Sequence, residues 1–222
     1  MGKRGTHLVW DWNGTLLDDI DAVIGATNAA FEEIGMEPIT LARYRELYCV
    51  PVPLFYERLM GRLPTEAEWV VMDGAFHRHY WARAGACGLT AGAAELLATR
   101  QAAGFTQSLL SLAPHERLIP IVQRHGIEER FVRVDGRIGD STAGKAAHMV
   151  RHLLALAGTV ASPDRVVVIG DAADDAVAAA HVGAQAVLYT GGSHCRASLE
   201  SVGVPVVDTL EEAVAVAEEL VA

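Results

Sequence analysis

The sequence lacks a long apolar segment, which bears on where the protein works. In 222 residues, no uninterrupted apolar run approaches the roughly 18 to 20 residues that a membrane-spanning helix needs. The apolar stretch after Lys3 and Arg4 extends only from Leu8 to Trp10 before Asp11 interrupts it, and this is too short for a signal peptide. We therefore expect a cytoplasmic protein with no membrane partner.

Cysteine and lysine are both scarce. The three cysteines, Cys49, Cys87 and Cys195, are far apart and form no Cys-x-x-Cys pair, so the sequence indicates neither a disulfide framework nor a zinc site. Only Lys3 and Lys145 among the eighteen basic residues are lysine. Since the acidic residues number twenty-eight, the net charge is −10, which repels a phosphate backbone and argues against nucleic acid as a partner.

The composition is that of a globular protein. Apolar residues make up 51% of the chain and charged residues 21%, which excludes a disordered tail, a collagen-like chain and a coiled-coil rod. The length exceeds that of a usual single domain, so we expect one large domain or a core with a modest insert.

The N-terminal part of the sequence predicts one buried strand followed by helices. Residues 7–12 form a short apolar run that ends in an acid and precedes a turn signal at 13–15. From Asp18 to about Ala86 the apolar spacing is helical throughout. Helix starts are indicated by a cap at Thr40, a first-turn proline at Pro53 and a capping box at Thr65 and Glu68.

After Cys87 the pattern alternates between helix and strand, which is typical of a parallel sheet with crossover helices. The predicted helices are 90–103 with a cap at Thr90, 114–125, 143–157, 173–182 and 209–221 with a cap at Asp208. The predicted strands are 105–111, 131–134, 165–170, 185–189 and 204–207. We therefore predict an α/β fold, a doubly wound parallel sheet built from residues 1–17 and 88–222, with an all-helical cap domain of residues 18–87 inserted after the first strand.

Four residues that could carry chemistry lie at or just beyond predicted strand ends. They are Asp11, Ser111, Asp171 and, after a turn, Lys145. Ligands of an open parallel sheet bind at the carboxyl ends of its strands, so we expect these side chains to converge. Two carboxylates that meet there repel each other unless a cation neutralises them, and their hard oxygen atoms suit Mg²⁺. The lysine and the hydroxyl would then face an anion.

These positions also carry a family resemblance. The sequence DWNGT at 11–15, Ser111 at the end of LLS, Lys145, and GDAADD at 170–175 resemble the four motifs of the haloacid dehalogenase superfamily of phosphohydrolases. They are most similar to its phosphoglycolate-phosphatase-like branch, which has a helical cap. The resemblance extends over nearly the whole chain, because the order and spacing of the motifs and the position of the helical insert all agree.

The resemblance implies a role for each acid. Asp11 is the expected nucleophile, which takes the phosphoryl group as an aspartyl phosphate. Asp11, Asp171 and the backbone carbonyl of Asn13 are expected to hold Mg²⁺, and Asp175 completes the acidic site. A carboxylate can attack phosphorus only when the charge on the phosphoryl oxygens is screened, and Mg²⁺ and Lys145 would provide that screening.

The resemblance also implies a substrate. Ser111 and Lys145 are expected to bind the phosphate of a small phosphorylated metabolite. Gly14 permits a tight turn that would direct backbone amides at that phosphate.

One residue departs from the family pattern. Phosphatases of this family have an aspartate two residues after the nucleophile, which protonates the leaving oxygen and later activates water, whereas this chain has Asn13. Loss of a positioned acid/base typically costs roughly 10² to 10⁴ in rate, so we expect a slow phosphatase that favours good leaving groups. The alternative is a catalytically impaired relative that binds a phosphorylated ligand or a protein partner.

Other reactions of the superfamily are disfavoured. A phosphonoacetaldehyde hydrolase needs a Schiff-base lysine from its cap, and residues 18–87 contain no lysine. A haloacid dehalogenase works without the metal and would not need Asp171 together with Asp175.

Two assignments have competitors nearby. Ser108 lies on the same predicted strand as Ser111, and Asp174 competes with Asp175, although the four-residue spacing from Asp171 favours Asp175. Both Asp174 and Asp175 could also cap the helix that follows them.

The histidines and aromatic residues favour structural roles. His77 and His79 are two apart on a predicted helix and point in different directions, so we expect surface histidines and no shared ion. His115 could approach the site from a loop, but a solvent-contacting residue at a helix start is favoured. Four aromatic residues at helical spacing are expected to form cap core, namely Trp69, Phe76, Tyr80 and Trp81.

Overall fold

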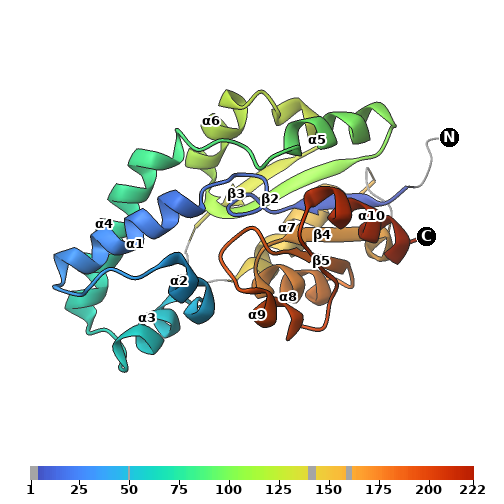
Figure 1. The fold of residues 1–222 in the computed structure, drawn as a ribbon. Helices are drawn as coiled ribbons and strands as arrows, with labels where there is room; N and C mark the ends of the chain where they lie inside the picture. Colours follow the sequence, from blue (N-terminus) through green and yellow to red (C-terminus); the bar gives the residue numbers. More distant parts are fainter. Residues whose placement is uncertain (1–4, 50, 140–143, 159–161) are drawn as a thin grey trace.

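A single parallel sheet organises the protein (Figure 1). The computed structural model describes residues 5–49, 51–139, 144–158 and 162–222, and within them the strands follow the order β3-β2-β1-β4-β5-β6. The strands are β1 (His7–Trp10), β2 (Gln107–Pro114), β3 (Val134–Arg137), β4 (Val166–Gly170), β5 (Gln185–Tyr189) and β6 (Val206–Val207). The chain proceeds outward from β1 on both sides, so the switch point lies between β1 and β4. The predicted doubly wound sheet is confirmed.

Helices cover both faces of this sheet. Leu8 and Trp10 of β1 pack on one helical layer and Val9 on the other, because successive strand side chains point to opposite faces. The first layer consists of α5 (Ala93–Ala102), α6 (His115–Arg124) and α10 (Leu210–Leu220), and the second of α7 (Lys145–Ala155), α8 (Ala173–His181) and α9 (Arg196–Glu200). Two short 3₁₀ helices, η1 (Glu128–Arg130) and η2 (Pro163–Arg165), precede β3 and β4. Burial on both faces explains the continuous apolar run of β4.

Four helices lie between β1 and the remainder of the sheet, and we call them the helical insert. They are α1 (Ile20–Glu33), α2 (Leu41–Leu47), α3 (Val52–Met60) and α4 (Glu66–Ala84). Apart from residue 50, which the structure does not describe, residues 18–87 contain no strand. The insert has its own hydrophobic cluster, which includes Phe31, Phe55 and Met72. Figure 1 shows the insert beside the sheet, on the side away from helix α10.

Local signals located most helix starts in the insert. The Thr40 side chain accepts a hydrogen bond from the Arg43 N–H, and Pro53 lies in the first turn of α3. The capping box of Thr65 and Glu68 is present at the start of α4. None of the helices in the described residues is long and apolar enough to cross a membrane.

Two predicted caps are wrong. Helix α5 starts after Gly92, whereas the Thr90 hydroxyl donates to the Thr15 carbonyl at 2.6 Å and ties the segment to the loop after β1. Helix α10 is capped by Thr209, not by Asp208, because Thr209 accepts the Glu212 N–H in a capping box.

Several predicted strand boundaries also shift, among them the end of β2, which is Pro114 and not Ser111. Strand β3 begins at Val134, three residues later than expected, because residues 128–130 form η1 and Phe131 packs into the core. Helix α7 begins at Lys145, and the predicted start at residue 143 lies outside the described residues.

A row of polar side chains is buried under α7. The Ser108 hydroxyl lies 2.8 Å from Nε2 of both His7 and His152, and the His152 Nδ1 lies 2.7 Å from Asp135. Ser108 is fully buried and engaged in this row, so it is not available to a ligand at the sheet edge. Burial, with smaller contributions from His152 and Arg100, lowers the pKa of His7 to about 3.

The depressed pKa of His7 predicts loss of stability in acid. The unfolded chain binds a proton at His7 below about pH 6.5, whereas the folded protein resists it until about pH 3. The free energy of unfolding should therefore fall between pH 6.5 and 3, by up to about 1.4 kcal/mol per pH unit from this residue. Urea unfolding at several pH values measures the slope. A His7→Gln variant should show a shallower slope and the exposed-site variant His77→Gln an unchanged one; equal slopes in all three proteins would refute the assignment.

Candidate active site

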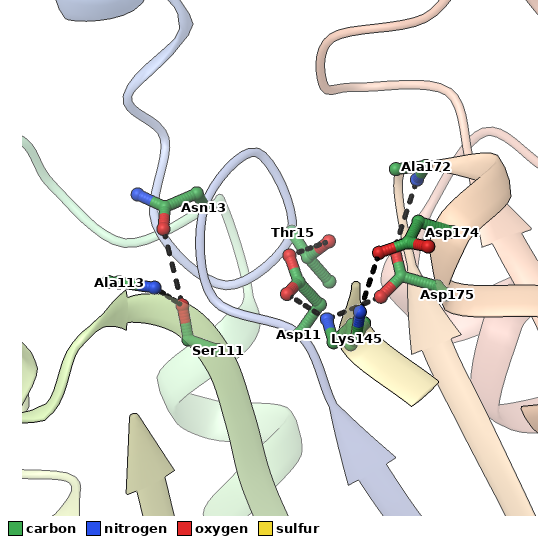
Figure 2. Close-up of polar contacts among 9 residues, drawn as sticks. All are labelled: Asp11, Asn13, Thr15, Ser111, Ala113, Lys145, Ala172, Asp174 and Asp175. Carbon is green, nitrogen blue, oxygen red and sulfur yellow. Dashed lines mark hydrogen bonds and ion pairs between the residues drawn. The ribbon is translucent and has the colours of Figure 1, made fainter. Parts of the chain in front are cut away.

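Three carboxylates and one ammonium group meet at the carboxyl edge of the sheet (Figure 2). Asp11 follows β1, Asp171 follows β4, Asp175 lies in the first turn of α8, and Lys145 is the first residue of α7. Oxygen atoms of the three acids lie within 4.8 Å of one another. The Lys145 Nζ donates to Asp11 Oδ1 and to Asp175 Oδ1. All four side chains are buried. The contacts among them show that Asp11, Asp171 and Lys145 converge, as predicted.

Burial makes this cluster electrostatically costly. It raises the pKa of Asp11 to about 7, although Lys145 opposes the shift, and it raises the pKa of Asp171 well above its ordinary value with help from the charges of Asp11 and Asp175. Burial alone would lower the pKa of Lys145, but the charges of Asp11 and Asp175 more than offset this and raise it. Three carboxylates against one ammonium leave an excess of negative charge, which a divalent cation would neutralise. Their oxygen atoms are a suitable donor set for such an ion.

Two glycine-containing loops hold Asp171. The Ser193 N–H donates to Asp171 Oδ2 at 2.7 Å, and a Cβ atom on Gly192 would overlap the Asp171 carboxylate. Gly14 has a φ of +69° and passes so close that a Cβ atom there would lie 2.8 Å from Asp171 Oδ2. Sequence reasoning missed Gly192 and Ser193, although their position just beyond a strand end was a usable signal.

The two adjacent acids of α8 have different partners. Asp175 contacts the Lys145 ammonium and also accepts the Ala172 N–H at 3.1 Å, so it joins the cluster and caps α8 at once. Asp174 accepts the backbone N–H of Lys145 at 3.0 Å, which places it at the start of α7. The geometry therefore favours Asp175 for the acidic cluster.

In Figure 2, Ser111 lies on the side of Asp11 that is away from Lys145. Its hydroxyl donates to Asn13 Oδ1 at 3.4 Å and accepts the Ala113 N–H at 3.0 Å. The site thus places a hydroxyl and an ammonium on either side of Asp11 in this view, where the two groups could face one anion.

Asn13 is held by residues that sequence reasoning did not place in the site. Its Nδ2 lies 2.7 Å from Asp19 Oδ2 and 2.6 Å from the Tyr80 hydroxyl, and that hydroxyl donates to Asp19 at 2.6 Å. Tyr80 comes from α4, so the expectation that it only fills the insert core is incomplete. The Gly14 N–H donates to Asp19 Oδ1 and to the Leu17 carbonyl, so Gly14 contributes its turn while its own amide is used within the loop.

The predicted surface histidines are confirmed. His77 is exposed and lies 3.5 Å from Asp73, and His79 is half-buried at the surface, 3.7 Å from Glu33. His115 begins α6, is half-buried and accepts the Gly136 N–H at its Nδ1.

The insert reaches the site through residues that the sequence did not indicate. Arg45 of α2 donates to the carbonyls of Gly191 and Gly192, each at 2.8 Å. The ring of Tyr48 contacts the buried ring of His194 at a centroid distance of 5.1 Å. The loop that holds Asp171 is therefore also the loop that the insert contacts.

Comparisons with known proteins agree with this fold. The family model for haloacid dehalogenase-like hydrolases matches residues 6–183. A phosphoglycolate phosphatase from Cereibacter sphaeroides is 27% identical over 83% of this chain and 85% of its own length. The solved structure of a haloacid dehalogenase-like family protein from Streptococcus pneumoniae has a TM-score of 0.79 at 18% identity and covers 96% of this chain and 98% of its own. Protein tyrosine kinase A from Mycobacterium tuberculosis has a TM-score of 0.76 at 24% identity, over 100% of both chains.

The acidic cluster predicts cation-dependent stability. Millimolar MgCl₂ should raise the melting temperature of the wild type, because a ligand that binds only the folded state stabilises it. Asp171→Asn should abolish this rise, whereas the adjacent-site control Asp174→Asn should retain it, since Asp174 contacts the α7 backbone. Differential scanning fluorimetry measures the shift. A full MgCl₂ response in Asp171→Asn would exclude the cluster as the cation site.

Proposed function

Since the chain belongs to the haloacid dehalogenase-like hydrolase family, we propose that it is a Mg²⁺-dependent phosphatase of small phosphorylated metabolites. The observation that carries this proposal is the buried meeting of Asp11, Asp171, Asp175 and Lys145 at the carboxyl edge of a doubly wound sheet. The relative from C. sphaeroides that is named a phosphoglycolate phosphatase supports the reaction class.

Some residues of the site would bind the metal and others the phosphate. Asp11, Asp171, Asp175 and the backbone carbonyl of Asn13 would hold Mg²⁺, which when bound supplies positive charge that screens the phosphoryl oxygens. Lys145 adds a fixed positive charge beside the nucleophile.

The reaction begins at Asp11. Its carboxylate attacks phosphorus, the bond from phosphorus to the leaving oxygen breaks, and an aspartyl phosphate forms while Ser111 and Lys145 hold the phosphoryl oxygens. An amide at residue 13 has no proton to give to the leaving oxygen, so good leaving groups react fastest. Water then releases the phosphate from Asp11 slowly, because Asn13 cannot act as a base.

The helical insert would act as a cap of residues 18–87 over a core of residues 1–17 and 88–222. The contacts of Arg45 and Tyr48 with the loop 190–195 support this role, because they join the insert to the loop that holds Asp171. The non-phosphate part of a substrate would lie against the insert.

A second candidate function is supported by Asn13 itself. Its side-chain nitrogen is engaged with Asp19 and Tyr80, so the site could bind a phosphorylated ligand or a partner without turnover. The distinction between the two functions is whether Asp11 becomes phosphorylated.

Anion binding should depend on one of the two lysines. Vanadate with Mg²⁺ should raise the melting temperature of the wild type. Lys145→Ala should lose most of this rise, because it removes the ammonium beside Asp11, and Lys3→Ala should keep it. Equal responses of the two variants would mean that the anion binds elsewhere.

Burst kinetics test the proposed reaction. With p-nitrophenyl phosphate and Mg²⁺, the wild type should release about one nitrophenolate per chain rapidly and then turn over slowly. Steady turnover of alkyl phosphates should be lower by roughly 10² or more, because they need a protonated leaving oxygen. Stopped-flow absorbance and mass spectrometry of Asp11 measure these steps. Absence of Asp11 phosphorylation with every substrate, or a burst that survives in Asp11→Asn, would exclude the proposed reaction.

A further inference from the structure

Three hydrogen-bond donors converge on one buried carboxylate beside the nucleophile loop. Asp19 is 1% exposed. Its Oδ1 accepts the Gly14 N–H at 2.8 Å, and its Oδ2 accepts Asn13 Nδ2 at 2.7 Å and the Tyr80 hydroxyl at 2.6 Å. Burial raises the pKa of Asp19, and these three hydrogen bonds oppose that rise because they stabilise its charged form.

This arrangement determines which end of the Asn13 amide faces the site. An ionised carboxylate can only accept hydrogen bonds, so the nitrogen of the amide must face Asp19. The Tyr80 hydroxyl gives its proton to Asp19 and therefore accepts the second N–H of Asn13 at 2.6 Å. The remaining atom, Oδ1, faces the Ser111 hydroxyl. Residue 13 thus presents an acceptor toward Ser111 and has no free donor.

We propose that Asp19 and Tyr80 are positioning residues that hold the side-chain oxygen of Asn13, Oδ1, toward the phosphoryl site, where this oxygen orients the attacking water. This inference rests on the proposed phosphatase function. When water attacks the aspartyl phosphate, its oxygen bonds to phosphorus and the bond from phosphorus to Asp11 breaks, returning its electron pair to the carboxylate. Both water protons leave on the phosphate product, because Asn13 accepts a hydrogen bond and takes no proton. The residue at position 13 thereby still orients the water, but it does not transfer a proton as the usual acid/base does.

The same geometry explains why a carboxylate at residue 13 alone would not restore a general acid/base. Asn13→Asp places two carboxyl groups where a carboxylate and an amide now meet, so the pair shares one proton and holds it between residues 13 and 19, away from the leaving oxygen. Asp19→Asn also leaves a hydrogen-bond donor without an acceptor. Both oxygens of Asp19 accept hydrogen bonds, and the amide of the variant would place its nitrogen, which is a donor, against one of the present donors. In the exchange Asn13→Asp/Asp19→Asn every partner is matched. The new amide accepts from Gly14 and donates to the new carboxylate and to the Tyr80 hydroxyl, which turns to donate to that carboxylate.

Kinetics of these variants test the proposal. With p-nitrophenyl phosphate and Mg²⁺, Tyr80→Phe and Asp19→Asn should each lower kcat about tenfold with KM within about twofold, because a misplaced orienting group affects the reaction more than binding. The matched controls are Asp18→Asn, which alters the exposed neighbour, and Tyr56→Phe, which alters another buried tyrosine of the insert, and both should remain within about twofold of wild type. The double exchange should exceed the wild type on alkyl phosphates by roughly 10², because it restores a general acid/base.

A spectroscopic readout keeps this test separate from the proposed function. The side-chain amide protons of Asn13, assigned by their loss in Asn13→Asp, should be shifted downfield and exchange slowly in the wild type. Tyr80→Phe should move one of them upfield. Solvent-like amide signals in the wild type, or wild-type kcat in both Tyr80→Phe and Asp19→Asn, would overturn the positioning role. If Asp11 is never phosphorylated, the phosphatase proposal and the water-orienting role fail together; downfield amide signals would then show that the hydrogen-bond network exists without that role.

Discussion

The excess negative charge at the carboxyl edge of the sheet is the constraint on which the site depends. Three buried carboxylates and one ammonium repel on balance, so their positions must be imposed by the rest of the fold. Parallel pairing of β1 and β4 places Asp11 and Asp171 at adjacent strand ends. Helix α7 brings Lys145 against two of the acids, and the close loop at Gly192 leaves room for the third. The folded state carries an electrostatic cost at this site, which a bound divalent cation would reduce.

Residue 13 is an amide within this site, and its two ends have different partners. The backbone turn at Gly14 and the hydroxyl of Ser111 are arranged around an amide in place of a carboxylate. Asp19 lies next to this amide as a buried carboxyl group, and it accepts hydrogen bonds from Asn13, Gly14 and Tyr80. The nitrogen of Asn13 is engaged by Asp19 and Tyr80, so its oxygen is the side-chain atom that faces Ser111.

The helical insert contacts the site at two separate points. Tyr80 of α4 bonds to Asn13 and Asp19 in the loop after β1, whereas Arg45 of α2 bonds to Gly191 and Gly192 in the loop after β5. These two loops hold the nucleophile and Asp171, respectively. A displacement of the insert would disturb both, so substrate contact with the insert and the geometry of the reacting groups are physically linked.

The sequence by itself determined the fold class and the four motif positions, because these depend on local patterns. A few consecutive residues are enough to recognise each of these patterns: the apolar run of β4, the capping box at Thr65 and the acids just beyond strand ends. It also indicated that Asn13 departs from its family. Caps such as Thr209 were missed because two adjacent residues could each serve, and only the backbone geometry selects one.

Tertiary structure alone decided which side chains complete the site. Ser108 and Ser111 lie on one strand, but His7 and His152 engage the first within the sheet and leave the second at its edge. Tyr80 carries the signature of a core aromatic residue, and its hydroxyl reaches Asn13 across 67 positions of sequence. Such contacts join segments that are distant in the chain, so no local periodicity encodes them; they arise only when the insert packs against the sheet and buried polar atoms must find partners.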